Sequence, residues 1–313
     1  MKATKLFLIL IFLFMGGNIA DVNAQSWLER LGKRAEEAAK RKVERKVEHK
    51  VEEKVDDAVN NVFDKAEESA KQKPKKKSTS NTSIVEPPDT GTPVDDTSDW
   101  DNNEPYYALK KGTVITYTMY DGKGKIQGYN QSEILDITRT RNSVNAVVSG
   151  RITDVKGKVQ NGGIVSISAQ NGNFHVNMLN IISPKGLEGV DFDAKMTGND
   201  MMIPIKLAPG QSLPDAYASF KMKMKAGTDV LEMPSLEFRV FNRRAVRAES
   251  VDTPLGKFIC FKIIQTVAVD YPLIGTRQGT SITWIGKGLG VIKSEFYDAK
   301  GKLASRMLLT GLE

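Results

Sequence analysis

One turn motif recurs three times in the C-terminal two thirds of the sequence. The pattern Asp-x-Lys-Gly-Lys occupies residues 121–125, 154–158 and 298–302. An Asp side chain can accept hydrogen bonds from the backbone amides of such a turn, and Gly adopts the positive φ that a tight hairpin needs. Three hairpins of one type predict a meander of sequential antiparallel strands. A meander of many strands generally closes or half-closes, because closure hides its edges.

The segments around these turns are short and rich in β-branched and aromatic residues, which favour strands. No amphipathic helix longer than a turn or two is evident, although residues 213–218 have the pattern of a short one. We therefore expect residues 105–313 to fold mainly as β, as one antiparallel meander that forms an open or closed barrel. The expected strands are 113–120, 144–148, 164–169, 174–179, 217–226, 236–249, 258–269, 281–285, 291–297 and 303–309.

Residues 1–24 have the layout of a secretory signal peptide. Lys2 and Lys5 precede an apolar run of ten residues, Leu6 to Met15, and the expected cleavage follows Ala24. Ten residues are too few to span the hydrocarbon core as a helix, which needs about 20, although an uncleaved anchor is the alternative. No cysteine lies near the cut, so we expect an exported periplasmic or envelope-associated protein that is not a lipoprotein.

Residues 25–71 predict a long charged α-helix. Ser26 and Glu29 match a capping box, and helix-forming Ala, Glu, Lys and Arg dominate. A four-residue repeat, Lys-Val-Glu-x three times and then Lys-Val-Asp-Asp, fills 42–57, so its valine stripe drifts around the helix instead of forming a heptad seam. Parallel coiled-coil pairing, antiparallel pairing and a solvated single helix are all compatible with this pattern. The Pro-, Ser- and Thr-rich residues 72–104 have little to bury and predict a disordered linker.

The basic excess lies in the expected β domain, which has 27 Lys and Arg residues against 18 Asp and Glu. Within 220–226 lysines alternate with apolar residues, so the lysines share one face of a strand. The alternative to a binding role for them is protection of an exposed sheet edge. Export makes nucleic acid an unsuitable partner, and an anionic envelope surface suits the charge better. The candidate binding residues are Lys221, Lys223, Lys225, Arg243 and Arg244.

The residue types that carry common chemistries are scarce. One cysteine and two histidines are too few for a Cys/His zinc site, and P-loop, His-Glu-x-x-His and Gly-x-Ser-x-Gly motifs are absent. His175 falls on the polar face of an expected strand, and Cys260 falls in an apolar run that indicates burial. We therefore expect no enzyme activity, catalytic residue, metal or cofactor. A carboxylate-based hydrolase is a less favoured alternative.

The C-terminal third carries a family resemblance. Its motifs are Asn242–Ser250, Thr253–Phe258 with Cys260, Trp284, and Gly288–Asp298, and the segment Tyr107–Val114 adds to them. Together they resemble the TapB-like family of exported proteins, which is related to domain of unknown function 3108. The resemblance covers about residues 105–313. It implies an exported bacterial protein, of a kind common in Bacteroidota, with an antiparallel barrel and no established reaction.

Two hypotheses for function follow. The first is a non-enzymatic envelope protein of uncharacterised role that binds a lipid or another apolar small molecule. The second is a structural or interaction protein. In it the charged helix mediates homo-oligomerisation, and the basic β domain binds another envelope protein or an anionic glycan.

Overall fold

A computed structural model describes residues 92–93, 105–178, 192–226, 229–232, 235–271 and 275–313. The chain divides into two compact units, and these residues all belong to the unit that contains 84–313. The predicted signal peptide, the predicted helix and all of the predicted linker except 92–93 lie outside the described residues. In the described part of the chain, no helix has the length and apolarity needed to cross a bilayer.

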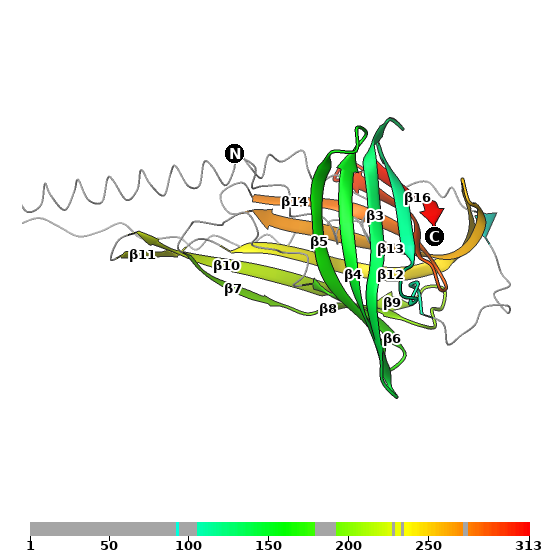
Figure 1. Ribbon diagram of the computed structural model, residues 1–313. Coiled ribbons are helices and arrows are strands. Elements are labelled where there is room, and N and C mark those ends of the chain that lie inside the picture. Colours follow the sequence, from blue (N-terminus) through cyan, green and yellow to red (C-terminus); the bar gives the residue numbers. More distant parts are fainter. Residues whose placement is uncertain (1–91, 94–104, 179–191, 227–228, 233–234, 272–274) are drawn as a thin grey trace, which may run out of the picture. The chain divides into compact units, whose positions relative to one another are not determined.

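The described residues form one 16-stranded antiparallel sheet, mostly of sequential hairpins, which confirms the expected mainly β architecture (Figure 1). Its hydrogen-bonded order is β11-β10-β12-β13-β14-β15-β16-β2-β3-β4-β5-β6-β8, with β1, β7 and β9 on the side of this path. The strands are β1 Thr92–Pro93, β2 Val114–Asp121, β3 Ile126–Arg139, β4 Ser143–Asp154, β5 Val159–Gln170, β6 Asn173–Asn177, β7 Phe192–Gly198, β8 Asp200–Pro204, β9 Ser212–Leu213, β10 Ala216–Ala226, β11 Asp229–Glu232, β12 Leu236–Thr253, β13 Gly256–Tyr271, β14 Gly275–Gly286, β15 Gly290–Asp298 and β16 Leu303–Leu312.

Each expected strand coincides with an observed one, and several strands were not predicted. The longest of these is β3, with 14 residues, and β7 and β8 are also among them. The short helix suggested for residues 213–218 is wrong, because those residues contribute to β9 and β10. Residues 92 and 93 of the predicted linker pair with β12 as β1, so this part of the linker is ordered against the sheet.

The three Asp-x-Lys-Gly-Lys turns have the predicted hairpin geometry. In the first, Asp121 Oδ1 accepts hydrogen bonds from the backbone amides of Lys123 and Lys125, each at 2.9 Å. The turns that begin at Asp154 and Asp298 repeat this pair of bonds. The glycines have φ values of 84°, 77° and 74° in chain order. The turns therefore join β2 to β3, β4 to β5 and β15 to β16 by one local mechanism.

The sheet closes on itself almost completely because the consecutive strands β7 and β8 pair with its two opposite ends. β7 pairs with β10 and β8 pairs with β6, and only Asn199 separates β7 from β8. At this switch the Asn199 side chain substitutes for a peptide group. Its Oδ1 accepts a bond from Tyr217 N at 2.7 Å, and its Nδ2 donates to Asp215 O at 3.1 Å. The result is a nearly closed barrel, as the turn repeats predict.

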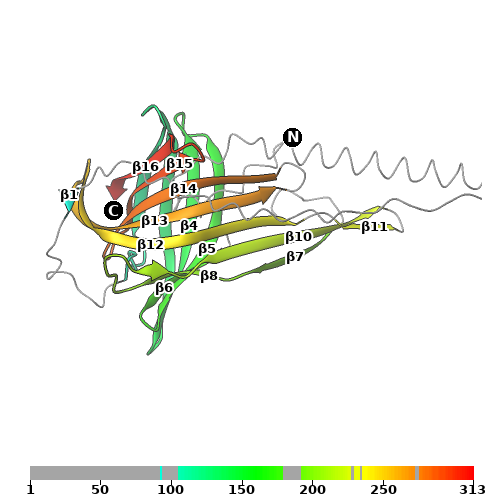
Figure 2. The same ribbon diagram turned by 180° about the vertical axis from the view of Figure 1, so that it is seen from behind.

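Two bulges bend β12. The first lies between Phe241 and Arg244, where Asn242 has a φ of 52°, and the second lies between Ala245 and Ala248. An inserted residue rotates the strand, so the inward-facing positions change from even to odd numbers at Arg243 and back at Ala248. Figures 1 and 2 show β12 and β13 curving at one end, and show β2–β5 crossing the direction of β12–β14.

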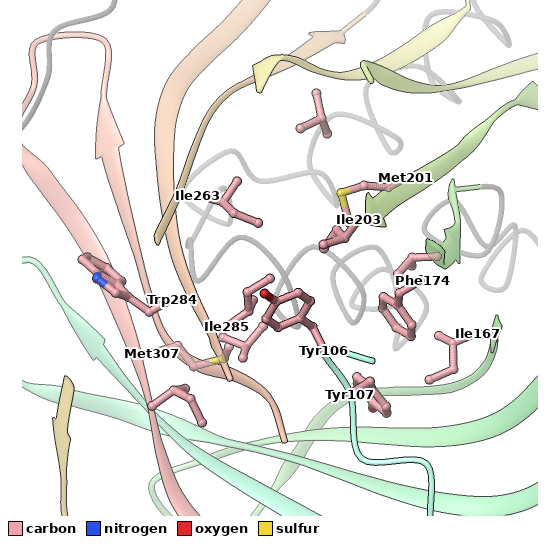
Figure 3. Packing of buried hydrophobic residues seen from close by; sticks show 14 of the residues in the cluster. Tyr106, Tyr107, Ile167, Phe174, Met201, Ile203, Ile263, Trp284, Ile285 and Met307 are labelled. Carbon is pink, nitrogen blue, oxygen red and sulfur yellow. The ribbon is translucent and has the colours of Figure 1, made fainter. Parts of the chain in front are cut away.

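The inner faces of both halves of the sheet share one hydrophobic core. Tyr106 and Tyr107, from the segment before β2, insert among core residues of several strands (Figure 3). Both are buried, at 1% and 3% exposure. Burial of an aromatic side chain contributes about 2 kcal/mol or more. Residues 105–113, here called the strap, are therefore part of the fold.

Candidate ligand-binding pocket

The strap is fixed across one end of the barrel by backbone hydrogen bonds. Pro105 O accepts from Gly288 N at 2.9 Å, which ties the strap to the β14–β15 turn. Gly112 N donates to Ile134 O at 2.8 Å, which ties it to β3. Bonds at both ends of a short segment leave it little freedom, so the strap is a fixed wall for whatever lies beside it.

Aromatic contacts hold the middle of the strap. The Tyr107 ring stacks on Phe174, with centroids 5.5 Å apart and planes inclined by 11°. The Lys287 ammonium lies 4.4 Å from the Tyr106 ring centroid, a cation–π distance. A Cβ at Gly290 would lie 3.3 Å from the Tyr107 ring, so glycine there lets the ring pack closely. Gly290 also has a φ of 97°, which disfavours other residues.

A pocket of about 870 Å³ opens between the strap and the turns that join β3 to β4 and β5 to β6. This volume is in the range of small-molecule sites. Its apolar lining comes from the strap, from strand ends and from the β14–β15 turn. These residues are Tyr107, Ala108, Leu109, Val144, Ala169, Ile205, Leu289 and Leu312.

Polar and basic side chains complete the lining. Lys110, Arg139 and Arg141 bring positive charge, and Glu313 brings the opposing carboxylate. Arg139 Nη2 donates to Leu109 O at 2.8 Å and so helps to hold the strap. Lys110 and Arg141 are exposed, and in the described part of the chain neither forms an ion pair. The pocket thus combines an apolar lining with two free cations.

Lys221, Lys223 and Lys225, here called the lysine ladder, lie on β10 in different surroundings. Lys221 is exposed on β10, directly opposite Lys195 of β7. Lys223 lies opposite Asp193 of β7 and Glu232 of β11 in register, and Lys225 lies opposite Val230. The side chains of Lys223 and Lys225 are outside the described part of the structure. None of these lysines lines the pocket.

Arg243 is buried, at 3% exposure, and its guanidinium is engaged within the chain. Its Nε donates to Gln265 Oε1 at 3.1 Å, and its Nη1 donates to Met202 O at 3.1 Å and to Pro214 O. Burial lowers the pKa of Arg243 to about 10 despite the nearby Asp215 carboxylate. Arg243 thus joins β12 to β13 and β8. The next residue, Arg244, is half-buried and pairs in register with Ile264.

A second polar cluster lies on the opposite face of β12–β15, around the buried Trp284. Trp284 Nε1 donates to Glu249 Oε2 at 2.7 Å, and Lys262 Nζ lies 3.2 Å from Glu249 Oε1. The Lys293 ammonium is 4.3 Å from the Trp284 ring centroid and 3.0 Å from Glu295. These contacts satisfy the buried carboxylates and tie four strands together, so the cluster is structural.

Glu295 shows the balance of forces within this cluster. Desolvation raises the pKa of its carboxyl, but Lys293, a hydrogen bond from Tyr297 and the nearby Arg306 together hold it below its ordinary value. Tyr297 Oη donates to Glu295 at 2.7 Å, and Arg306 Nε donates at 2.9 Å. The carboxylate is therefore held in its ionised form.

His175 and Cys260 are also not free for chemistry, because one lies beside a carboxylate and the other is buried. His175 Nδ1 lies 3.6 Å from Asp200 Oδ2, and its side chain is only 12% exposed, so it is less accessible than a surface strand histidine. Cys260 is buried as expected, and desolvation raises the pKa of its thiol. Among the described residues, no group of three or more His, Cys, Asp or Glu is placed to hold a metal ion.

The pocket was not predicted from the sequence. Its residues come from the strap, three turns and the ends of several strands, which are far apart in the chain. One local signal was available, the pair formed by Arg139 at the end of β3 and Arg141 in the turn that follows it. Two arginines in a short turn have fewer structural uses than lysines on a strand edge.

Comparisons with known proteins are consistent with this fold. No curated protein matches the chain. A candidate exported protein with a YmcC-like fold from Bacteroides fragilis is similar in structure, with a TM-score of 0.53 and 24% identity, over 67% of this chain and 99% of that one. A candidate lipoprotein from Parabacteroides distasonis has a TM-score of 0.55 and 21% identity, with the same coverage. The DUF3108-like family matches residues 110–309. Since this match spans more than half of the sequence, the chain belongs to the DUF3108-like family, the relation that its C-terminal motifs indicate.

Proposed function

We propose that the protein is an exported, non-enzymatic module of the cell envelope that binds a small amphipathic anion in the pocket beside the strap. The observation that carries this proposal is the combination of an apolar lining with the unpaired cations Lys110 and Arg141. An alkyl chain would cover the apolar lining, and a carboxylate or phosphate would face the cations. This is the lipid-binding hypothesis made specific to one site.

A binding role accounts for the polar residues better than catalysis does. The buried carboxylates are held by cations and hydrogen bonds, and the Cys260 thiol is buried with a raised pKa. A catalytic acid, base or nucleophile needs access to substrate. The basic side chains of Lys110 and Arg141 can supply charge complementarity to a bound anion without taking part in a reaction.

The envelope location rests on the signal-peptide pattern of residues 1–24. The description of the Bacteroides fragilis neighbour as a candidate exported protein agrees with it. The expectation that the protein is not a lipoprotein has no such support, because the Parabacteroides distasonis neighbour is described as a candidate lipoprotein. The proposal therefore does not include it.

Fluorescent fatty-acid displacement by dodecanoate tests the proposed site. We expect Lys110→Gln combined with Arg141→Gln to weaken dodecanoate binding about tenfold, since two partly exposed charge contacts contribute about 1.4 kcal/mol together. Lys156→Gln with Lys300→Gln, two exposed turn lysines outside the pocket, removes the same charge and should leave affinity unchanged. Absence of dodecanoate binding, or equal losses in both double variants, would contradict the proposal.

The interaction hypothesis keeps one specific observation in its favour. Lys221 and Lys195 are exposed on neighbouring strands and lie directly opposite each other. Like charges in this arrangement destabilise a sheet, so an anionic partner would relieve their repulsion. We propose an anionic glycan or an acidic envelope protein as that partner. Assembly through residues 25–71 belongs to this second proposal. Sedimentation velocity with and without 25–71 tests it, and equal monomeric mass would contradict assembly.

A further inference from the structure

Four buried oxygen atoms inside the barrel have no hydrogen-bond partner within the described structure. They are Tyr107 Oη, Tyr117 Oη, Asn130 Oδ1 and Ser132 Oγ, here called the interior polar row. All four residues are at most 3% exposed. A buried polar group without a partner costs about 1–3 kcal/mol. Native proteins contain few such atoms, so a group of them in one region is unusual.

The row is continuous across the inner face of the sheet. Tyr117 of β2 and Asn130 of β3 are directly opposite each other, and Ser132 is two residues farther along β3 on the same face. The pKa of Tyr117 is raised, first by burial and then by the influence of Tyr107. The strap and two strands thus bring their unpartnered oxygens together.

Two glycines lie next to the row in the strand register. Ser132 is opposite Gly150 of β4, and Gly150 is in turn opposite Gly163 of β5. No side chain projects from the sheet at these two positions. The side chains of the surrounding core cluster are apolar, so the row is a polar site within an apolar interior.

The pocket adjoins the row at Tyr107. Tyr107 belongs to both, since its side chain lines the pocket and its hydroxyl is one of the unpartnered atoms. Thr113 also lines the pocket, and Thr113, Ile115 and Tyr117 follow one another on the buried face of the chain. With a rise of about 3.4 Å per residue, Tyr117 lies about 14 Å farther along the chain than Thr113. This is a distance that an alkyl chain can bridge.

We infer that the interior polar row recognises a neutral hydrogen-bonding group, a hydroxyl, on the alkyl chain of an amphipathic anion whose charged end lies near Lys110 and Arg141. This inference rests on the proposed function and specifies its ligand class as hydroxylated amphiphiles. None of the four row residues is charged at neutral pH, so the row suits an uncharged group and would reject a carboxylate. A hydroxyl can donate and accept at once, which matches the mixed character of phenol, amide and serine oxygens.

A ligand panel that differs only in the hydroxyl group tests the inference. The probes are dodecanoate, 3-hydroxydodecanoate and 12-hydroxydodecanoate, measured by calorimetry on the full chain. Only the hydroxyl of 12-hydroxydodecanoate is far enough from the carboxylate to reach the row, so we expect this acid to bind about tenfold more tightly than dodecanoate and 3-hydroxydodecanoate to bind like dodecanoate. We expect Tyr117→Phe to bring the affinity for 12-hydroxydodecanoate close to that for dodecanoate. Tyr120→Phe is the matched control, because Tyr120 is on the same strand but half-buried on its other face, and it should keep the preference.

The outcomes separate the inference from the proposed function. If dodecanoate binds and hydroxylation adds nothing, the inference is wrong and the proposed function stands. If none of the three acids binds, both fail. The melting temperature of unliganded Tyr117→Phe gives an independent check, because removing an unpartnered hydroxyl should leave it unchanged or raise it. A fall of several degrees would show that the hydroxyl is already satisfied in the free protein, which would overturn the inference.

Discussion

Replacing Arg243 by Met should open the sheet near its closure. The side chain is buried, and it donates to Gln265 of β13, to Met202 O of β8 and to Pro214 O. Met preserves most of the apolar volume but leaves these acceptors without a donor. Each unsatisfied buried acceptor costs about 1–3 kcal/mol, and partial relaxation reduces the sum. We therefore expect a loss of about 3–5 kcal/mol in the free energy of unfolding, comparable to breaking a buried ion pair.

Urea unfolding followed by circular dichroism measures this loss, and a thermal melt should show a decrease of about 10 °C or more. Arg277→Met is the matched control, because Arg277 is exposed at the start of β14, and it should change stability by less than about 0.5 kcal/mol. The loss of stability for Arg243→Lys should lie between those of the two Met variants. The lysine ammonium keeps the charge, but it cannot donate to several separate acceptors as the planar guanidinium does. A loss below about 1 kcal/mol for Arg243→Met would refute the assignment of Arg243 as a tie between strands.

Three further predictions concern the turns and the thiol. Gly157→Ala should destabilise the domain by about 1 kcal/mol in urea titrations. Its φ is 77° and a Cβ there meets no atom within 4 Å, so the loss would come from backbone strain alone, and parent-like stability would contradict this reading. The pKa values of Asp121 and Asp154 are lowered, first by hydrogen bonds from the amides of Lys125 and Lys158. A lowered folded-state pKa gives stability that is present above the unfolded-state value and is lost as pH falls through the folded value. The double variant Asp121→Asn and Asp154→Asn should therefore show a weaker dependence of the free energy of unfolding on pH below about pH 4. An acid titration of stability identical to that of the parent protein would argue against this prediction. Cys260 should react with a thiol reagent only after unfolding, because the thiol is buried and its pKa is raised, and rapid labelling of the native protein would disprove its burial.

The features that were predictable from sequence are those decided by local chemistry. An Asp side chain and a Gly three residues later are enough to specify each Asp-x-Lys-Gly-Lys turn, and the turns define the meander. Runs of β-branched residues identify most of the strands, because the preference of these residues for strands is also a local property. β7 and β8 were missed because their role is a change of partner at Asn199, which depends on β6 and β10 rather than on their own residues.

Features that depend on distant residues were not predictable. Arg243 looked like a surface charge, but the bulge at Asn242 changes which side chains point inward, and distant carbonyl groups then satisfy the guanidinium. The pocket is assembled from turns that only the closed sheet brings together, so Lys110 and Arg141 had no visible relation in the sequence. The lysine ladder was conspicuous because it is local.

Native mass spectrometry of the full chain, purified gently from cell envelopes, tests the central claim most directly. If the pocket binds an amphipathic anion, the parent protein should carry the added mass of one amphipathic acid, and organic extraction should release it. The Lys110→Glu and Arg141→Glu double variant should lose it, while a Lys156→Glu and Lys300→Glu variant should keep it. A parent protein that is always empty, even after incubation with hydroxylated and plain fatty acids, would contradict the account.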